Sequence, residues 1–201
     1  MFFVLLAILI VFIIAFIVFV VAIKKMTSET FVKMCSKKVK RIAKGRKLLY
    51  LDDLELANFD GERILVNQVI FGEKYIYLIT DFLLKGFVNG SAKDNSWLYY
   101  NTSTKKTNYL NNIFDILDKN SRDFAGILGI STNPFTSICV VPNECDFDIK
   151  ENEKNRKLIV RFSSLRHLIN TYEKEKIGCL NKQQLREQYE SIEIRNRQAK
   201  Q

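Results

Sequence analysis

The sequence is poor in the residues that most often carry catalysis or bind zinc. It has one histidine, His167, and four dispersed cysteines with no Cys-x-x-Cys pair. A nucleophile–base pair built on histidine would have to use His167, and no serine or cysteine motif of such an enzyme accompanies it. The short ligand spacings of a structural zinc site are absent. The scattered cysteines favour free thiols in a reducing compartment.

Glycine-rich nucleotide-binding motifs are also missing. The Gly45-Arg46-Lys47 segment lacks the Gly-x-x-x-x-Gly-Lys-Ser/Thr frame of a phosphate-binding loop, and no Rossmann glycine fingerprint occurs. The chain shows neither internal repeats nor a low-complexity linker. A single domain, held by the N-terminal anchor described next, is therefore the simplest organisation.

Charge and polarity are absent from the start of the chain. Residues 2–23 form an apolar run of 22 residues without a polar side chain, glycine or proline. A bilayer core about 30 Å thick needs roughly 20 apolar residues, and backbone groups in lipid must pair within the segment, so the run predicts a transmembrane helix. A cleaved signal peptide is the alternative, but it would carry positive charge before a shorter apolar core. We interpret the run as a membrane anchor.

The net charge of +9 is concentrated immediately after this run. Residues 24–47 hold ten basic side chains and a single acid, Glu29. By the positive-inside rule, the N-terminus lies outside the cell and the rest of the chain lies in the cytoplasm, at the cell membrane. The basic residues expected at the membrane surface are Lys24, Lys25, Lys37, Lys38, Lys40, Arg41, Lys44, Arg46 and Lys47. Because the charge is local, it does not make the rest of the chain a general nucleic-acid binder.

Residues 24–51 are predicted to form a basic juxtamembrane helix. Phe31, Cys35, Val39 and Ile42 recur at steps of three and four residues, with lysines between them. Such a helix suits contact with anionic headgroups, at about 1 kcal/mol for each basic residue near the surface. A solvated linker whose charges only set the topology explains the same pattern, and the sequence leaves both interpretations open.

The remaining sequence predicts an α/β domain over residues 52–196, a mixed β-sheet flanked by helices, followed by a polar tail at 197–201. Helices are expected at 52–69, 109–120, 165–172 and 182–196. Strands are expected at 74–81, 87–88, 97–100, 137–141 and 157–162, where aromatic and β-branched residues concentrate. The aromatic residues of these strands suit a base-stacking platform. Ordinary packing in a sheet needs the same residues and is the preferred interpretation.

This order of elements resembles the nuclease-related domain (NERD) family, whose fold is that of restriction-endonuclease-like nucleases. The resemblance spans residues 54–192. Gly61-Glu62 matches a Gly-Glu pair in the family's opening helix, and Gly86 and Gly90 match glycines that bound a hairpin. Trp97 matches a tryptophan in the following strand, and 108–112 matches the opening of the next helix. The resemblance implies a restriction-endonuclease-like fold.

The catalytic Glu-x-Lys motif of that family is not retained. The resemblance places Thr80 at the glutamate position and Phe82 at the lysine position. Asp81 between them is expected to point to the opposite face of the strand, and Lys85 lies in the following turn. Hydrolysis in such sites needs carboxylates that hold a divalent cation, which Glu62 alone does not supply. The 17 residues between Glu62 and Thr80 leave little room for the strand that usually carries the metal-binding aspartate.

The sequence therefore predicts a catalytically inactive NERD-like domain that binds or scaffolds at the cytoplasmic face of the membrane. Its expected partners are the lipid bilayer, including anionic lipids, and an unidentified protein, and no cofactor is expected. The alternative is a membrane-associated metal-dependent nuclease, which would use Mg²⁺, or a nucleic-acid-binding protein. Nucleic acid is the less favoured partner because the chain is balanced in charge after residue 47.

Overall fold

The computed structural model describes residues 12–14, 16, 27–150, 153–154, 156–175 and 180–200. Most of the predicted transmembrane segment at 2–23 lies outside these residues, as do Lys24 and Lys25. Within the described part, no helix combines the length and hydrophobicity needed to cross a bilayer. The anchor therefore stays a prediction from the sequence.

The first long helix, α2 (Ser28–Arg46), packs its apolar stripe into the core of the domain. Thr27 caps its N-terminus, since the threonine Oγ1 accepts a hydrogen bond from the Thr30 amide at 3.2 Å. Lys47, with a left-handed backbone (φ 57°), ends it. The helix predicted at 24–51 therefore stops earlier than expected. Its apolar stripe faces protein rather than lipid, so only the basic face of α2 is available to a membrane surface.

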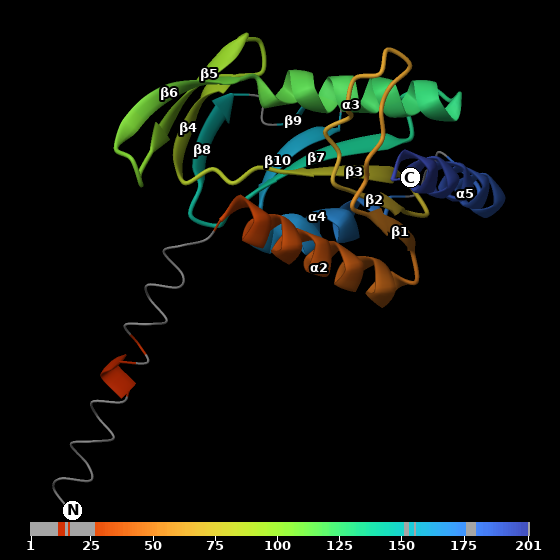
Figure 1. Ribbon diagram of the computed structural model, residues 1–201, viewed down its shortest axis with the longest axis horizontal. Coiled ribbons are helices and arrows are strands. Elements are labelled where there is room, and N and C mark those ends of the chain that lie inside the picture. The colour runs from red at the N-terminus through yellow and green to blue at the C-terminus, as the bar shows by residue number, and fades with distance from the viewer. Residues whose placement is uncertain are drawn as a thin grey trace, which may run out of the picture.

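A six-stranded mixed sheet forms the centre of the fold (Figure 1). Its strands, in spatial order, are β1 (Leu49–Asp52), β2 (Gln68–Phe71), β3 (Ile76–Asp81), β7 (Phe135–Val141), β10 (Lys157–Arg161) and β9 (Glu153–Lys154). Neighbouring strands from β1 to β3 are antiparallel, whereas β3, β7 and β10 run parallel to one another. The strands predicted at 74–81, 137–141 and 157–162 are confirmed.

The helix predicted at 52–69 is wrong. Residues 53–67 form a loop that enters β2, with one isolated bridge between Ala57 and Arg63. Its buried apolar residues come in pairs two positions apart, Leu54 with Leu56 and Ile64 with Val66, so their spacing is that of extended chain. Asn58 shapes the turn between these pairs, because its side-chain oxygen accepts hydrogen bonds from two nearby backbone amides.

A second, four-stranded sheet lies beside the first. Its spatial order is β6 (Lys106–Asn111), β5 (Ser96–Asn101), β4 (Gly86–Ser91) and β8 (Asp146–Lys150). The strands predicted at 87–88 and 97–100 are confirmed and are longer than expected. The helix predicted from residue 109 begins later, because 106–111 pairs with β5. Asn112 then caps α3 (Ile113–Leu128) by accepting a hydrogen bond from the Phe114 amide at 2.9 Å.

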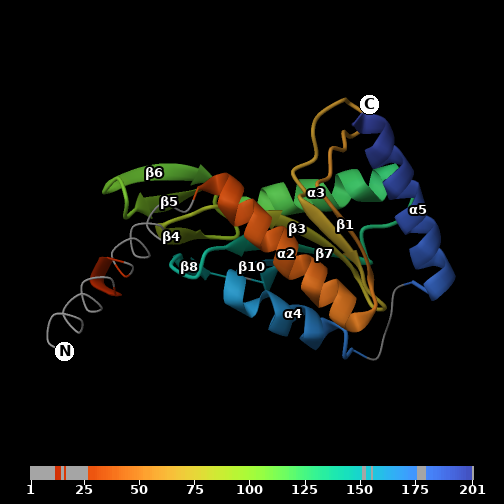
Figure 2. The same ribbon diagram turned by 60° about the horizontal axis from the view of Figure 1, so that its bottom comes forward.

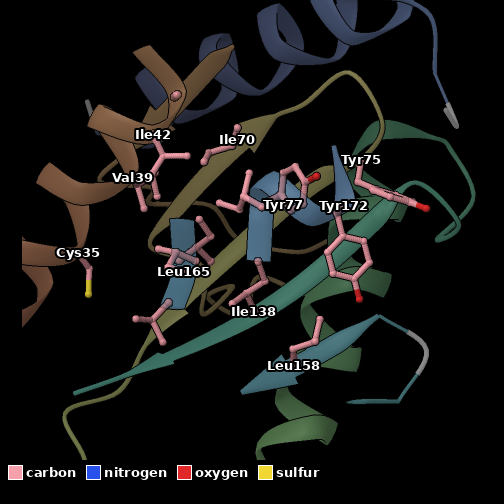
Figure 3. Packing of buried hydrophobic residues seen from close by; sticks show 14 of the residues in the cluster. Cys35, Val39, Ile42, Ile70, Tyr75, Tyr77, Ile138, Leu158, Leu165 and Tyr172 are labelled. Atoms are coloured by element: carbon pink, nitrogen blue, oxygen red, sulfur yellow. The ribbon is translucent and has the colours of Figure 1, made fainter. Parts of the chain in front are cut away.

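Helices cover both faces of the six-stranded sheet. On one face, α2 lies beside α4 (Leu165–Tyr172), which follows the short 3-10 turn η1 (Phe162–Ser164) (Figures 1 and 2). Figure 3 shows the cluster on this face, where Ile42 of α2, Ile70 of β2 and Leu165 of α4 meet. On the other face, α3 and α5 (Lys182–Ala199) bury Phe124 and Ile192. The helices predicted at 165–172 and 182–196 are confirmed, and α5 extends into the predicted polar tail.

Gly90 in β4 has no room for a side chain, because Trp97 of β5 lies against it. A Cβ atom at Gly90 would lie 2.2 Å from Cδ1 of Trp97, which is itself buried edge-on against Phe114. We expect Gly90→Ala to lower the free energy of unfolding by about 2 kcal/mol, through overpacking. Urea denaturation of the full chain would measure this loss.

The matched control for this substitution is Gly45→Ala in α2. Nothing lies within 4 Å of a Cβ atom built at Gly45. Alanine is a better helix former than glycine by up to about 1 kcal/mol, so this variant should be slightly more stable. Equal effects of the two substitutions would contradict the steric argument.

Candidate functional site

Thr80, which the sequence resemblance placed at a catalytic glutamate position, serves a structural role in β3. Its Oγ1 donates to the carbonyl oxygen of Leu65 at 2.6 Å and accepts from Nδ2 of Asn120 at 3.2 Å. Asn120 of α3 also donates to the Leu65 carbonyl at 2.9 Å. The threonine is 4% exposed. These bonds tie β3 and α3 to the loop before β2, and they occupy the hydroxyl.

The other sequence-derived positions lie in separate environments. Glu62 is on the exposed loop and pairs with Lys119 of α3 at 2.9 Å, and the hydrogen bond and charge of that lysine lower the pKa of Glu62. Phe82 packs against the apolar cluster between α3 and the second sheet. The backbone of Lys85 exchanges hydrogen bonds with the Tyr99 hydroxyl, at 2.8 and 3.1 Å. In the described contacts, Glu62, Phe82 and Lys85 do not come together in one site.

Asp81 instead belongs to a polar cluster on the α2 side of the sheet. Alternation along β3 turns it away from Thr80, as the sequence predicts. Its Oδ1 accepts a hydrogen bond from Nε2 of Gln68, the first residue of β2, at 3.3 Å. Its backbone amide donates to Oδ1 of Asn67 at 3.4 Å. The strand β2 lies within the 17 residues between Glu62 and Thr80, and it places Gln68 opposite the end of β3.

Two oxygen atoms of this cluster are buried without a hydrogen-bond partner among the described residues. They are Oε1 of Gln68 and Oδ2 of Asp81. Gln68 is 1% exposed and lines a cleft of about 510 Å³. An unsatisfied buried acceptor raises the free energy of the folded chain, so a hydrogen-bond donor or a cation that reached these two oxygens would stabilise it.

The cleft lies between the first half of α2 and the residues around the start of β2. Residues of α2 form one wall, and Asp53, Arg63, Asn67 and Gln68 form the other. In the α2 wall, Oγ of Ser36 donates to Oδ2 of Asp52 at 3.1 Å, and Asp52 is the cross-strand partner of Gln68. The antiparallel strands β1, β2 and β3 therefore each place one polar residue, Asp52, Gln68 and Asp81, at the same end of the strands.

The electrostatics of Asp81 are set by burial. Burial raises the pKa of its carboxyl to about 6, against the opposing effect of the Gln68 hydrogen bond. Cys35 of α2 lies near it, and burial together with the charge of Asp81 raises the pKa of the cysteine thiol. Asp81 therefore changes its charge close to physiological pH, and Cys35 stays a neutral thiol.

The donor set of this cleft is incomplete for a catalytic metal. Among the described residues, no three His, Cys, Asp or Glu side chains are placed to share a metal ion. Gln68 supplies a neutral amide, and the residue two positions after Asp81 is Leu83, which packs against the apolar cluster beneath α2. The cations that line the cleft, Lys33, Lys37 and Arg63, come from α2 and the loop. These groups, together with Glu29 and Asp53, are able to bind a polar ligand.

Comparison with known proteins adds no relative: no family model matches the chain, and no curated protein or solved structure matches it.

Proposed function

We propose that this chain is a membrane-tethered domain of restriction-endonuclease-like architecture that binds a partner at the cytoplasmic face of the membrane and does not hydrolyse nucleic acid. Its tether would be the apolar run at 2–23, and the basic residues after that run would set the orientation. The order of β2, β3, α3 and β7 is compatible with the NERD resemblance over residues 54–192, although the segment around Gly61-Glu62 is a loop and not the helix that the resemblance implies.

The observation that carries the proposal is the replacement of charged groups around Asp81. Metal-assisted hydrolysis of a phosphodiester needs carboxylates that hold the cation and a group that stabilises the developing charge. Here the residue of β2 that faces Asp81 is Gln68, whose amide is neutral. A lysine on the same face of the strand would stand two positions after Asp81, and that position holds Leu83. The register suggested by the sequence, Thr80 and Phe82, lacks both groups as well. In either register, β3 offers no Glu-x-Lys pair.

A metal-dependent nuclease is the second candidate. It is favoured by the two partnerless oxygens, Oδ2 of Asp81 and Oε1 of Gln68, because Mg²⁺ prefers oxygen ligands and accepts as few as one or two carboxylates. Asp81 would supply the negative charge that holds such an ion. The two candidates therefore differ in what Asp81 does.

Incubation of the detergent-solubilised full chain with DNA and RNA should give no cleavage that depends on Mg²⁺ or Mn²⁺. Single- and double-stranded substrates would be followed by gel electrophoresis, with a chelator as the blank. Metal-dependent cleavage that is lost in Asp81→Ala but kept in Glu62→Ala would establish the nuclease instead. Glu62 is the matched control because it is an exposed acid that pairs with Lys119, away from Asp81.

A further inference from the structure

A second hollow lies on the same face of the sheet, between α2 and the η1–α4 segment. It has a volume of about 560 Å³. Lys37, Lys38 and Arg41 line it from α2, and Arg166 lines it from α4. Among the residues that the structure describes, no acidic side chain lines it. Figures 1 and 2 show α2 and α4 side by side. We call this hollow the α2–α4 groove.

No acidic side chain in the described part of the chain neutralises the cations of the α2–α4 groove. Lys37, Arg41 and Arg166 are exposed and form no ion pair with any described residue. Lys38 donates to the backbone carbonyls of Phe162 and Ser163, so it is fixed in place but keeps its charge uncompensated. Burial lowers the pKa of Lys38, and the charge of Arg166 lowers it further. An anion between these side chains would relieve the repulsion.

Apolar side chains lie among these cations. Met34, Ile42 and Phe162 line the same groove, and Met34 is 40% exposed. The ammonium of Lys38 lies 4.1 Å from the centre of the Phe162 ring. The ammonium covers one face of this ring, so that face is not available for stacking on a nucleobase, which is how single-stranded nucleic acids gain much of their affinity, while the rest of the ring can contact hydrocarbon. The combination suits a molecule with a phosphate at one end and hydrocarbon at the other.

The position of the groove along the chain also favours lipid. Only residues 24–27 separate the apolar run from the start of α2, which allows at most about 14 Å of extended chain. Met34 lies two turns into α2 and Arg41 lies four turns in, at about 1.5 Å per residue. If the run is the anchor, the groove is held within reach of lipid headgroups.

We infer that the α2–α4 groove binds the phosphate headgroup of an anionic phospholipid between Lys37, Arg41 and Arg166, with the adjoining hydrocarbon against Met34 and Phe162. The inference rests on the proposed membrane tether and makes it more specific. The inference predicts one defined lipid site, and not only a diffuse attraction of all the basic residues at 24–47 to a negative surface.

The test compares two double variants of the detergent-solubilised full chain. Arg41→Gln/Arg166→Gln removes one charge from each wall of the groove. Lys40→Gln/Lys44→Gln removes two exposed charges of α2 that lie outside it. Native mass spectrometry would follow titration with dioctanoyl phosphatidylglycerol, dioctanoyl phosphatidylcholine, glycerol phosphate and a short single-stranded oligonucleotide. Thermal melting would verify that both variants fold, as expected because all four side chains are exposed.

We expect phosphatidylglycerol to bind at least tenfold more tightly than phosphatidylcholine. That preference should be lost in Arg41→Gln/Arg166→Gln and kept in Lys40→Gln/Lys44→Gln. Equal weakening in both variants would refute the site while leaving the proposed function intact. Glycerol phosphate binding as tightly as the lipid would refute the lipid part, and tighter binding of the oligonucleotide would make the groove a nucleic-acid site. Absence of any preference for phosphatidylglycerol would count against both the groove and the membrane-surface role.

Discussion

Replacing Glu173 by alanine is expected to lower the free energy of unfolding by about 4 kcal/mol, since it orphans three hydrogen-bond donors around one buried carboxylate. Glu173 follows α4 and is 9% exposed. Its carboxylate accepts hydrogen bonds from the amides of Glu73 and Lys74, at 2.9 and 3.3 Å, and from the Tyr77 hydroxyl at 2.6 Å. It therefore joins the end of α4 to the turn between β2 and β3.

Two further variants separate the carboxylate from the bulk of the side chain. Glu173→Gln keeps the shape but turns one acceptor into a donor that faces a backbone amide, so about half of the loss should remain. Glu190→Ala removes an exposed partner of Arg186 and should change stability by less than about 1 kcal/mol. Denaturation of the full chain followed by circular dichroism measures all three. A Glu173→Ala chain as stable as Glu190→Ala would show that the carboxylate contributes nothing.

The elements that could be predicted from the sequence are those whose local pattern and tertiary environment agree. The strands β3 and β7 are buried on both faces, so they read as continuous runs of apolar and β-branched residues. The start of α5 was recognisable from Asn181, which forms a capping box with Gln184. In these segments, the local pattern and the tertiary environment favour the same conformation.

The elements that were missed depend on partners elsewhere in the chain. The strand β6 (Lys106–Asn111) is mostly exposed and polar, and it is a strand because β5 pairs with it. The strands β1 and β2 have only four residues each, too few to show a period. The loop at 53–67 carries acids and leucines that imitate a capped helix, but its extended chain is held by burial against α3 and α5.

The polar cleft was hidden for the same reason. Gln68 faces the end of β3 only because it pairs with Ile79 in the antiparallel register of β2 and β3. A glutamine or an asparagine does not by itself indicate a site in a sequence. Because a helix was expected at 52–69, the strand that begins at Gln68, next to Asn67, was not predicted. The signal that could have been found is Asp81 itself, a charged residue at the end of an otherwise apolar strand. Alternation correctly assigned it to the face opposite Thr80, and that face holds the cleft.

Asp81→Asn is expected to raise the free energy of unfolding at pH 8 by about 3 kcal/mol, because an ionised carboxylate is unfavourable where Asp81 is buried. The pKa of Asp81 is about 6 in the folded chain, against an ordinary value of 3.8. At a pH between these two values, Asp81 keeps its proton in the folded chain and loses it in the unfolded chain. The contribution of Asp81 to the stability of the wild-type chain is therefore most favourable below about pH 4, falls as the pH rises to about 6, and is level above that.

The asparagine should remove this dependence while keeping an acceptor for Gln68. Urea denaturation from pH 4 to pH 8 would compare the wild type with Asp81→Asn and with Asp60→Asn, an exposed acid on the loop. Asp60→Asn should keep the wild-type profile, and a wild-type profile in Asp81→Asn would contradict the assignment. The same titration with added Mg²⁺ separates the two candidate functions. An ion bound by Oδ2 of Asp81 would stabilise the wild type above pH 6 and leave Asp81→Asn unchanged. A binding domain without catalysis requires no such shift, so Asp81 would then be a buried acid whose charge costs stability without recruiting a metal.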